Sequence, residues 1–168
     1  YGDERYAVRI GSKVPVSHRE ALLTDAANAG PSVTVEHVEV DFTDPHQMRA
    51  LSLENADSIV FMGSDWTESA EESDARTLMG SLIVDELFCD RDRKPNVVME
   101  LLDPDNATLV ARSRGELIIS PLVLSHLLTQ VALRPELQPV FDELITVGGA
   151  EITFRPLSSY TESAQVTF

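Results

Sequence analysis

Short apolar runs alternate with longer amphipathic stretches along most of this chain. The clearest run lies between Ala56 and Gly63, where four consecutive apolar residues indicate a central strand covered by helices on both faces. β-Branched residues between positions 33 and 40 predict another strand, buried on at least one face. Further strands are predicted at residues 6–10, 96–102, 115–119 and 151–155.

Helical patterns fill the segments between these strands. Ser17 is the expected N-cap of a helix running to about Asn28, and Asp44 followed by Pro45 starts a shorter one. A long helix is predicted from about Glu68 to Phe88, with a buried apolar stripe. That stripe consists of Leu78, Leu82, Ile83 and Leu87. Later helices are predicted after residue 103, from residue 120 and from residue 135.

This alternation of strands and helices predicts an α/β fold with a Rossmann-like doubly wound parallel sheet over residues 1–120. Residues 121–168 are expected to form a small C-terminal α+β portion. No glycine-rich turn precedes Tyr6, so the first strand of such a sheet and its phosphate-binding turn are missing from this sequence. Because the chain begins with Tyr1, we expect it to be a piece of a longer protein.

Charge and composition narrow the functional classes. The formal net charge is -15, which repels phosphate backbones and anionic lipid, so nucleic acid is excluded as an expected partner. The acidic excess serves solubility or offers a surface for divalent cations. The single Cys89 makes no intrachain disulfide and indicates a reducing compartment, and no apolar run is long enough for membrane insertion. The expected location is the cytoplasm.

Nucleotide binding is the first candidate chemistry. Ligands of open α/β sheets bind beyond the carboxyl ends of the strands, which here lie near residues 41–44 and 63–65. The expected cofactor-binding residues, for NAD or another nucleotide, are Asp41, Thr43, Gly63, Ser64 and Asp65. The absent glycine-rich turn weighs against this site within the chain itself.

Metal binding is the second candidate. Acidic residues crowd the predicted start of the long helix, and Glu100, Asp103 and Asp105 leave the neighbouring strand. Hard cations such as Ca²⁺ take six to eight oxygen ligands, so two such clusters suit them. Acidic side chains at a helix start also offset the helix dipole, which gives a purely structural alternative.

Catalysis is not expected. The four histidines, His18, His37, His46 and His126, are scattered, and no arrangement of nucleophile, base and oxyanion donors is visible. We expect His126 to be packed in a core and Cys89 to be structural.

The segment from Val40 to about Arg155 resembles the cytoplasmic regulator-of-K⁺-conductance (RCK) domains and the related domains of Trk-type uptake systems. It is similar, more closely, to the gating domains of the Castor and Pollux type of ion channel. The motifs that carry this resemblance stand in the same order: Asp41-Phe42-Thr43-Asp44, Ser73-Asp74-Ala75-Arg76-Thr77-Leu78, Glu100-Leu101-Leu102-Asp103-Pro104, and Leu133-Arg134-Pro135-Glu136-Leu137 followed by Phe141-Asp142-Glu143-Leu144.

The resemblance implies a ligand-sensing gating domain of a cation channel, and more specifically of a potassium channel. Such a domain lies on the cytoplasmic side of the cell membrane and forms a homo-oligomeric ring below the pore domain of the parent chain. Ca²⁺ ligands in related domains correspond here to Asp74 and Glu100, with Asp103 as an extra candidate. Leu102 stands at one of the paired acidic positions, a departure from a conventional Ca²⁺ site. Two alternatives stay open: a structural oligomerisation module, whose interface helix covers residues 122–131, and a nucleotide-dependent oxidoreductase fragment.

Overall fold

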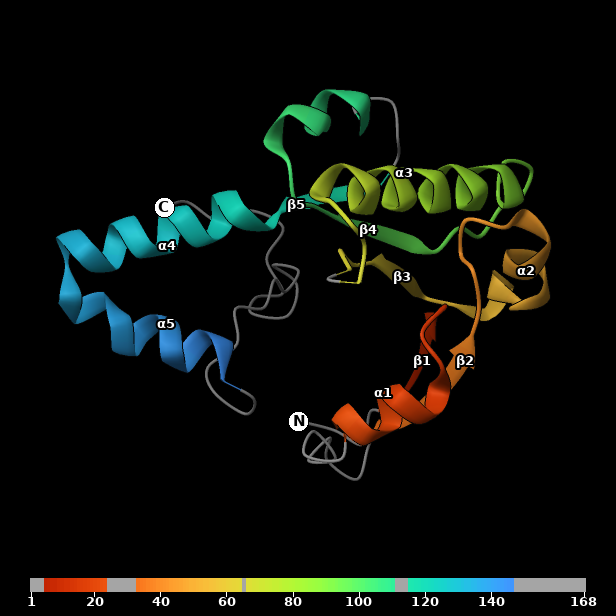
Figure 1. Cartoon of the computed structure of the whole chain (residues 1–168), viewed down its shortest axis with the longest axis horizontal. Coiled ribbons are helices and arrows are strands. Elements are labelled where there is room, and N and C mark those ends of the chain that lie inside the picture. Colours follow the sequence, from red (N-terminus) through yellow and green to blue (C-terminus); the bar gives the residue numbers. More distant parts are fainter. Residues whose placement is uncertain (1–4, 24–32, 65, 111–114, 147–168) are drawn as a thin grey trace, which may run out of the picture. The chain divides into compact units, whose positions relative to one another are not determined.

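The structure is a computed structural model that describes residues 5–23, 33–64, 66–110 and 115–146 (Figure 1). Its strands are β1 (Tyr6–Ser12), β2 (Val33–Glu39), β3 (Ser58–Phe61), β4 (Asn96–Leu101) and β5 (Glu116–Ile119). Its α-helices are α1 (Val16–Leu23), α2 (Pro45–Ala50), α3 (Ala70–Leu87), α4 (Ser120–Leu133) and α5 (Gln138–Ile145). Three 3₁₀ turns join them: η1 (Leu53–Asn55), η2 (Pro104–Val110) and η3 (Pro135–Leu137).

The described strands pair only in parallel. β1 pairs with β2, with Val8 opposite Val35, and a separate sheet has the order β3-β4-β5, with Glu100 opposite Ile118. The predicted parallel α/β class is therefore confirmed. In a doubly wound sheet, the first strand lies between the second and the fourth. Without that strand, such a sheet consists of a two-stranded and a three-stranded part, and β1-β2 and β3-β4-β5 correspond to these two parts. The strand predicted at residues 151–155 lies outside the described residues.

One face of the β3-β4-β5 sheet carries the main core. Side chains alternate across a strand, and Phe61, Met99 and Leu101 point to the buried face, which α3 covers (Figure 1). On the other face, Val60 is 58% exposed and Ile118 47% exposed. Within the described residues, this second face of the sheet is thus partly exposed.

Small side chains let α3 approach this sheet closely. Its buried residues include Asp74, Thr77, Gly80 and Val84. A Cβ atom at Gly80 would lie 2.5 Å from Cε1 of Phe61. The predicted apolar stripe is only partly right: Ile83 is buried, Leu78 and Leu87 are half-buried, and Leu82 is exposed. Periodicity failed at Leu82 because polar and small residues occupy much of the buried side of α3.

Local capping agrees with the sequence at α2 and differs at α1. Asp44 is the N-cap of α2 and accepts a hydrogen bond from the backbone N–H of His46, with Pro45 at the first turn, as predicted. α1 begins at Val16, one residue before the expected N-cap. The buried guanidinium of Arg19 holds this end of the sheet by donating to the carbonyls of Ile10 and Val38.

The chain divides into two compact units, residues 1–123 and 124–168. The domain boundary predicted after residue 120 falls at the start of α4 and stays a prediction. His126 on α4 is exposed, so the expected core position for it is wrong. Among the described residues, no helix combines the length and apolarity that crossing a bilayer requires.

Candidate functional site

The carboxyl ends of the strands carry a cluster centred on Asp41. This residue follows β2, and its carboxylate accepts hydrogen bonds from the backbone N–H and the hydroxyl of Thr43, at 3.1 and 2.7 Å. It also forms ion pairs with Lys13, just beyond β1, at 3.0 Å and with Arg76 of α3 at 2.9 Å. The structure thus brings together the predicted residues Asp41 and Thr43 and adds two cations that the prediction lacked.

The ionised form of Asp41 is strongly favoured. Burial alone would raise the pKa of Asp41, but the hydrogen bonds from Thr43 and the positive charges of Lys13 and Arg76 together hold this pKa well below its usual range. Asp41 is therefore a permanent anion at physiological pH. Two cations face this single carboxylate, so the cluster has a local positive excess within an acidic chain.

Arg76 contacts two aromatic rings. Its guanidinium carbon is 5.2 Å from the ring centroid of Phe42 and 4.8 Å from that of Trp66. Both distances are within the range of cation–π attraction. The Arg76 Nε atom is buried and has no hydrogen-bond partner in the described part of the chain. Arg76 is thus fixed in position, and one of its donors is unused.

Side chains of the protein itself accept the hydrogen bonds of the backbone N–H groups in the loop after β3. The backbone N–H of Gly63 donates to Glu100 at 2.7 Å, and that of Ser64 donates to the hydroxyl of Ser73 at 3.0 Å. Both predicted loop residues therefore direct their N–H groups at the protein. Asp65 lies outside the described residues. Within the described residues, Arg76 and Trp66 connect this loop to the Asp41 cluster.

Asp74 is a buried anchor for the segment after β4. Its side chain is 1% exposed, and its two oxygens accept hydrogen bonds from the backbone N–H groups of Leu102 and Asp103, at 2.8 and 3.0 Å. The side-chain amide of Asn106 donates a third, at 2.8 Å. Both oxygens therefore face N–H donors, which stabilise the carboxylate as a cation would.

Glu100 occupies a different position at the same edge of the sheet. One of its oxygens accepts from Gly63, and the other accepts from the hydroxyl of Ser120, the first residue of α4. Asp103 accepts from the backbone N–H of Asp105. Among the described residues there is no group of three or more His, Cys, Asp and Glu placed to hold a metal. The predicted metal residues share this edge, but their contacts are with N–H and O–H donors, and the Ca²⁺ site stays a prediction.

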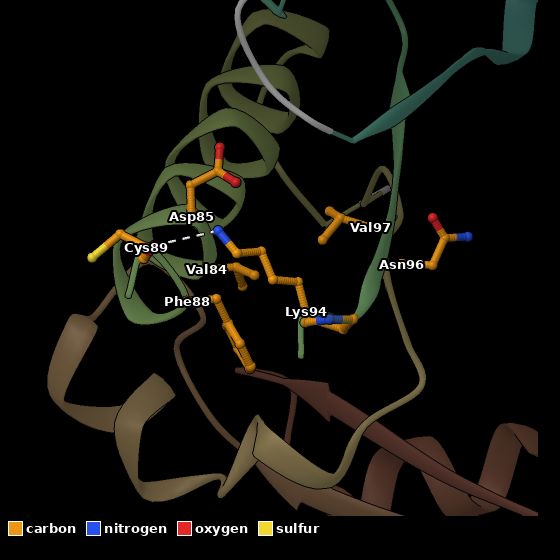
Figure 2. A pocket seen from close by; sticks show the side chains of 8 residues that line it. Val84, Asp85, Phe88, Cys89, Lys94, Asn96 and Val97 are labelled. Carbon is orange, nitrogen blue, oxygen red and sulfur yellow. Dashed lines mark hydrogen bonds between the residues drawn. The ribbon is translucent and has the colours of Figure 1, made fainter. Parts of the chain in front are cut away.

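A cavity of about 440 Å³ lies at the opposite end of the sheet, where α3 ends and β4 begins (Figure 2). Val84, Phe88 and Val97 line it together with the charged Asp85 and Lys94. Lys94 donates to the carbonyl of Cys89 at 3.4 Å, while the Cys89 sulfur points away from Lys94. The Cys89 thiol is exposed. This cavity is at the amino end of β4, away from the edge where the ligand residues were predicted.

The sequence reasoning missed Lys13, Trp66, Arg76 and Ser120 as members of this edge. Arg76 stands one helical turn before Gly80, beside the buried positions of α3, and an arginine next to a predicted core is a signal for a buried ion pair. Lys13 and Ser120 each follow directly on a strand, where parallel topology collects side chains at one edge.

Comparison with known proteins identifies relatives of the chain. The probable ion channel POLLUX of Arabidopsis thaliana is 32% identical over 107 residues, which cover 62% of this chain and 12% of the relative. The ion channel POLLUX of Lotus japonicus is 31% identical over the same length. This chain is homologous to a segment of Castor/Pollux-type ion channels. The probable ion channel CASTOR of Oryza sativa is 24% identical over 180 residues, covering 88% of the chain and 20% of the relative.

The resemblance to Castor and Pollux expected from the sequence motifs is thus confirmed, while the chain spans between about a tenth and a fifth of the length of these channels. No family model matches the chain. A solved structure of the human SLO3 gating ring is similar with a TM-score of 0.49 and 10% identity, covering 67% of this chain and 19% of that one.

Proposed function

We propose that this chain is a ligand-sensing regulatory domain on the cytoplasmic side of a Castor/Pollux-type cation channel. The observation that carries the proposal is the homology to these channels over 107 residues. The proposed parent chain contributes a pore domain that conducts potassium, and sister copies of the domain form a ring below it. The chain is proposed to act through binding and to catalyse no reaction.

The geometry favours an anionic ligand such as a nucleotide. Lys13 and Arg76 pair with Asp41, and Arg76 also contacts the 39%-exposed ring of Trp66, at the edge where parallel sheets bind ligands. A phosphate would find positive charge there, and a base would find a ring on which to stack. NAD is the dinucleotide we would test first. Ca²⁺ at Asp74, Glu100 and Asp103 is the second candidate, because Glu100 and Asp103 lie at the carboxyl end of β4 and Asp74 of α3 hydrogen-bonds to the same segment.

A ligand regulates only when it binds one conformation better than another. The loop after β3 connects the Asp41 edge to α4. Trp66 follows this loop, and the Glu100 carboxylate accepts hydrogen bonds both from the Gly63 N–H in the loop and from Ser120 at the start of α4. A ligand that moves the loop changes the hydrogen bonds of Glu100. We therefore propose that occupancy of the Asp41 edge alters the position of α4.

Calorimetric titration of the chain with NAD, with ATP and with CaCl₂ tests the ligand class. We expect heat and an increased melting temperature with a nucleotide, and loss of both in Arg76→Ala. The matched control is Arg93→Ala, which removes an arginine that also pairs with an aspartate, Asp57, at an exposed site. Heat with CaCl₂ alone would support the second candidate. Absence of heat with all three at millimolar concentration would contradict the proposal.

A second experiment separates sensing from the two alternatives. In the intact parent channel in a planar bilayer, Arg76→Ala should abolish the response of open probability to the ligand, while Arg93→Ala keeps it. A structural oligomerisation module predicts identical gating in both variants. An oxidoreductase fragment predicts turnover of a nicotinamide cofactor, measurable as a change in its absorbance.

A further inference from the structure

The cavity at the amino end of β4 combines apolar walls with a few polar groups (Figure 2). Val84 of α3 and Phe88, the C-cap residue of that helix, are its most buried lining residues, at 2% and 6% exposure. Val97 of β4 adds a third apolar side chain. The volume of about 440 Å³ and this mixture of walls are both typical of small-molecule sites.

Two opposite charges border the cavity without forming an ion pair. Asp85 follows Val84 on α3 and is half-buried, and Lys94 stands just before β4 with an exposed side chain. The ion pairs of the described residues include neither Asp85 nor Lys94. The cavity therefore offers a carboxylate and an ammonium group to a ligand that carries both charges.

Lys94 is held only weakly by the protein itself. Its side chain runs from the start of β4 to the end of α3, where Nζ donates to the Cys89 carbonyl at 3.4 Å (Figure 2). That distance exceeds the range of about 2.7–3.2 Å for a good N–H···O bond. Capping of a helix end is the purely structural alternative for this lysine. A ligand carboxylate would accept from Nζ in a shorter, charge-assisted bond, which favours binding over capping alone.

The two charges also limit the class of ligand. A carboxylic acid without an amine would bring its negative charge beside Asp85, and an amine without a carboxylate would face the Lys94 ammonium. Like charges placed next to each other at a binding surface are unfavourable. A nucleotide has the same difficulty, because its phosphates would lie beside Asp85. A zwitterion with an apolar body avoids these repulsions.

We propose that this cavity binds a free amino acid with an apolar side chain. The α-carboxylate of the ligand pairs with Lys94, its α-ammonium group pairs with Asp85, and its side chain packs on Val84 and Phe88. This second ligand site lies on α3, as does Arg76 of the Asp41 cluster, but the two sites share no residue. The inference therefore does not rest on the proposed function.

Calorimetric titration of the 168-residue chain with L-leucine tests the inference. The comparison compounds are isocaproate, which is leucine without its amine, and isoamylamine, which is leucine without its carboxylate. We expect leucine to bind at millimolar concentration or below, and each analogue to bind about 10-fold more weakly or worse, since each loses one charge-assisted contact. Absence of leucine binding at millimolar concentration overturns the inference, and so does equal affinity for the three compounds.

Two variants locate the binding in this cavity. Lys94→Met keeps the aliphatic stem without the charge, and Asp85→Asn keeps the shape of the side chain. Each should weaken leucine binding by about 10-fold. Arg93→Met is the matched control, because Arg93 precedes Lys94 in the sequence but pairs with the exposed Asp57. It should leave the affinity unchanged, and a loss as large as that of Lys94→Met would contradict the inference.

Backbone amide chemical shifts of the wild-type chain give a second readout that does not depend on any variant folding. Leucine should shift the amide signals of Val84, Phe88 and Val97 and leave those of Asp41 and Thr43 in place. The largest shifts at Asp41 and Thr43 would overturn the inference. A nucleotide should give the reverse pattern, so a failure of this inference is distinguishable from a failure of the sensor proposal.

Discussion

The carboxylate of Glu100 accepts a hydrogen bond from the Ser120 hydroxyl and a second from the backbone N–H of Gly63. One side chain from the central strand β4 therefore connects the loop after β3 with the first residue of α4. In both bonds the acceptor is a carboxylate oxygen of Glu100.

Loss of the Ser120 hydroxyl should destabilise the chain. We expect Ser120→Ala to lower the free energy of unfolding by about 1–2 kcal/mol, because one charge-assisted hydrogen bond to a half-buried carboxylate is lost. Glu100→Ala should cost more, about 3 kcal/mol, since it also leaves the Gly63 N–H without its acceptor. Urea unfolding followed by circular dichroism measures both. Ser125→Ala, at an exposed position of the same helix, should have almost no effect, and a comparable loss there would contradict this account.

Asp74 should contribute to stability whether or not a cation is present. Asp74→Ala removes the acceptor for Leu102, Asp103 and Asn106 at a buried position, and we expect it to lower the free energy of unfolding by about 3 kcal/mol. The exposed Asp90→Ala is the control. Thermal melts in EDTA and in CaCl₂ provide the measurement. A variant that loses stability only in CaCl₂ would show that the carboxylate serves a metal.

Asp41 should make stability depend on pH. Its pKa in the folded chain is below that in the unfolded chain, so the unfolded state binds a proton first as the pH falls. The stabilisation is complete above about pH 4, the ordinary range of an aspartate, and is lost as the pH falls further toward the folded-state value.

Asp41→Asn tests this sign. At pH 7 we expect the variant to be less stable than the wild type by roughly 2 kcal/mol, because the pairs with Lys13 and Arg76 lose their charge. The difference should shrink as the pH falls below about 4. Urea unfolding across this pH range measures it, with the exposed Asp92→Asn as the control. A difference that is constant with pH would mean that packing, and not charge, explains the loss.

Gly80 should not tolerate a side chain. A Cβ atom there would lie 2.5 Å from the Phe61 ring and 3.0 Å from that of Phe42. Although alanine is the better helix former by about 1 kcal/mol, we expect Gly80→Ala to be destabilising by about 1–3 kcal/mol, because the buried ring of Phe61 and the half-buried ring of Phe42 must move. Differential scanning calorimetry measures the change, and the half-exposed neighbour Met79→Ala is the control. A stabilised Gly80→Ala would show that α3 can shift away from the sheet.

Local signals in the sequence predicted the parallel strands and the cap of α2. β-Branched runs identified β2 and β3, and Asp44 with Pro45 marked the start of α2 because capping depends on neighbouring residues. The exposure of Leu82 and Val60 was not predictable in this way. Which face of a strand or helix is covered depends on segments far away in the chain, and periodicity alone carries no such information.

The sequence predicted where the candidate ligand site lies, at the carboxyl ends of the strands, but it predicted only some of the residues that form the site. Parallel topology placed Asp41 and Gly63 at the carboxyl ends of two parallel strands, β2 and β3, as a general rule of α/β sheets. It could not show that Arg76 reaches Asp41 from α3, because that pair is 35 residues apart in sequence. Nor could it show that N–H donors already occupy both oxygens of Asp74.

β3 hydrogen-bonds to β4 along one side, and no described strand pairs with its other side. In the described part of the chain this side of β3, beside the exposed Val60, is an edge of the sheet, and a strand edge is a template for an extended polypeptide. At high concentration, the isolated chain is therefore expected to aggregate through this edge of β3. A short peptide that pairs with the same edge should prevent this aggregation.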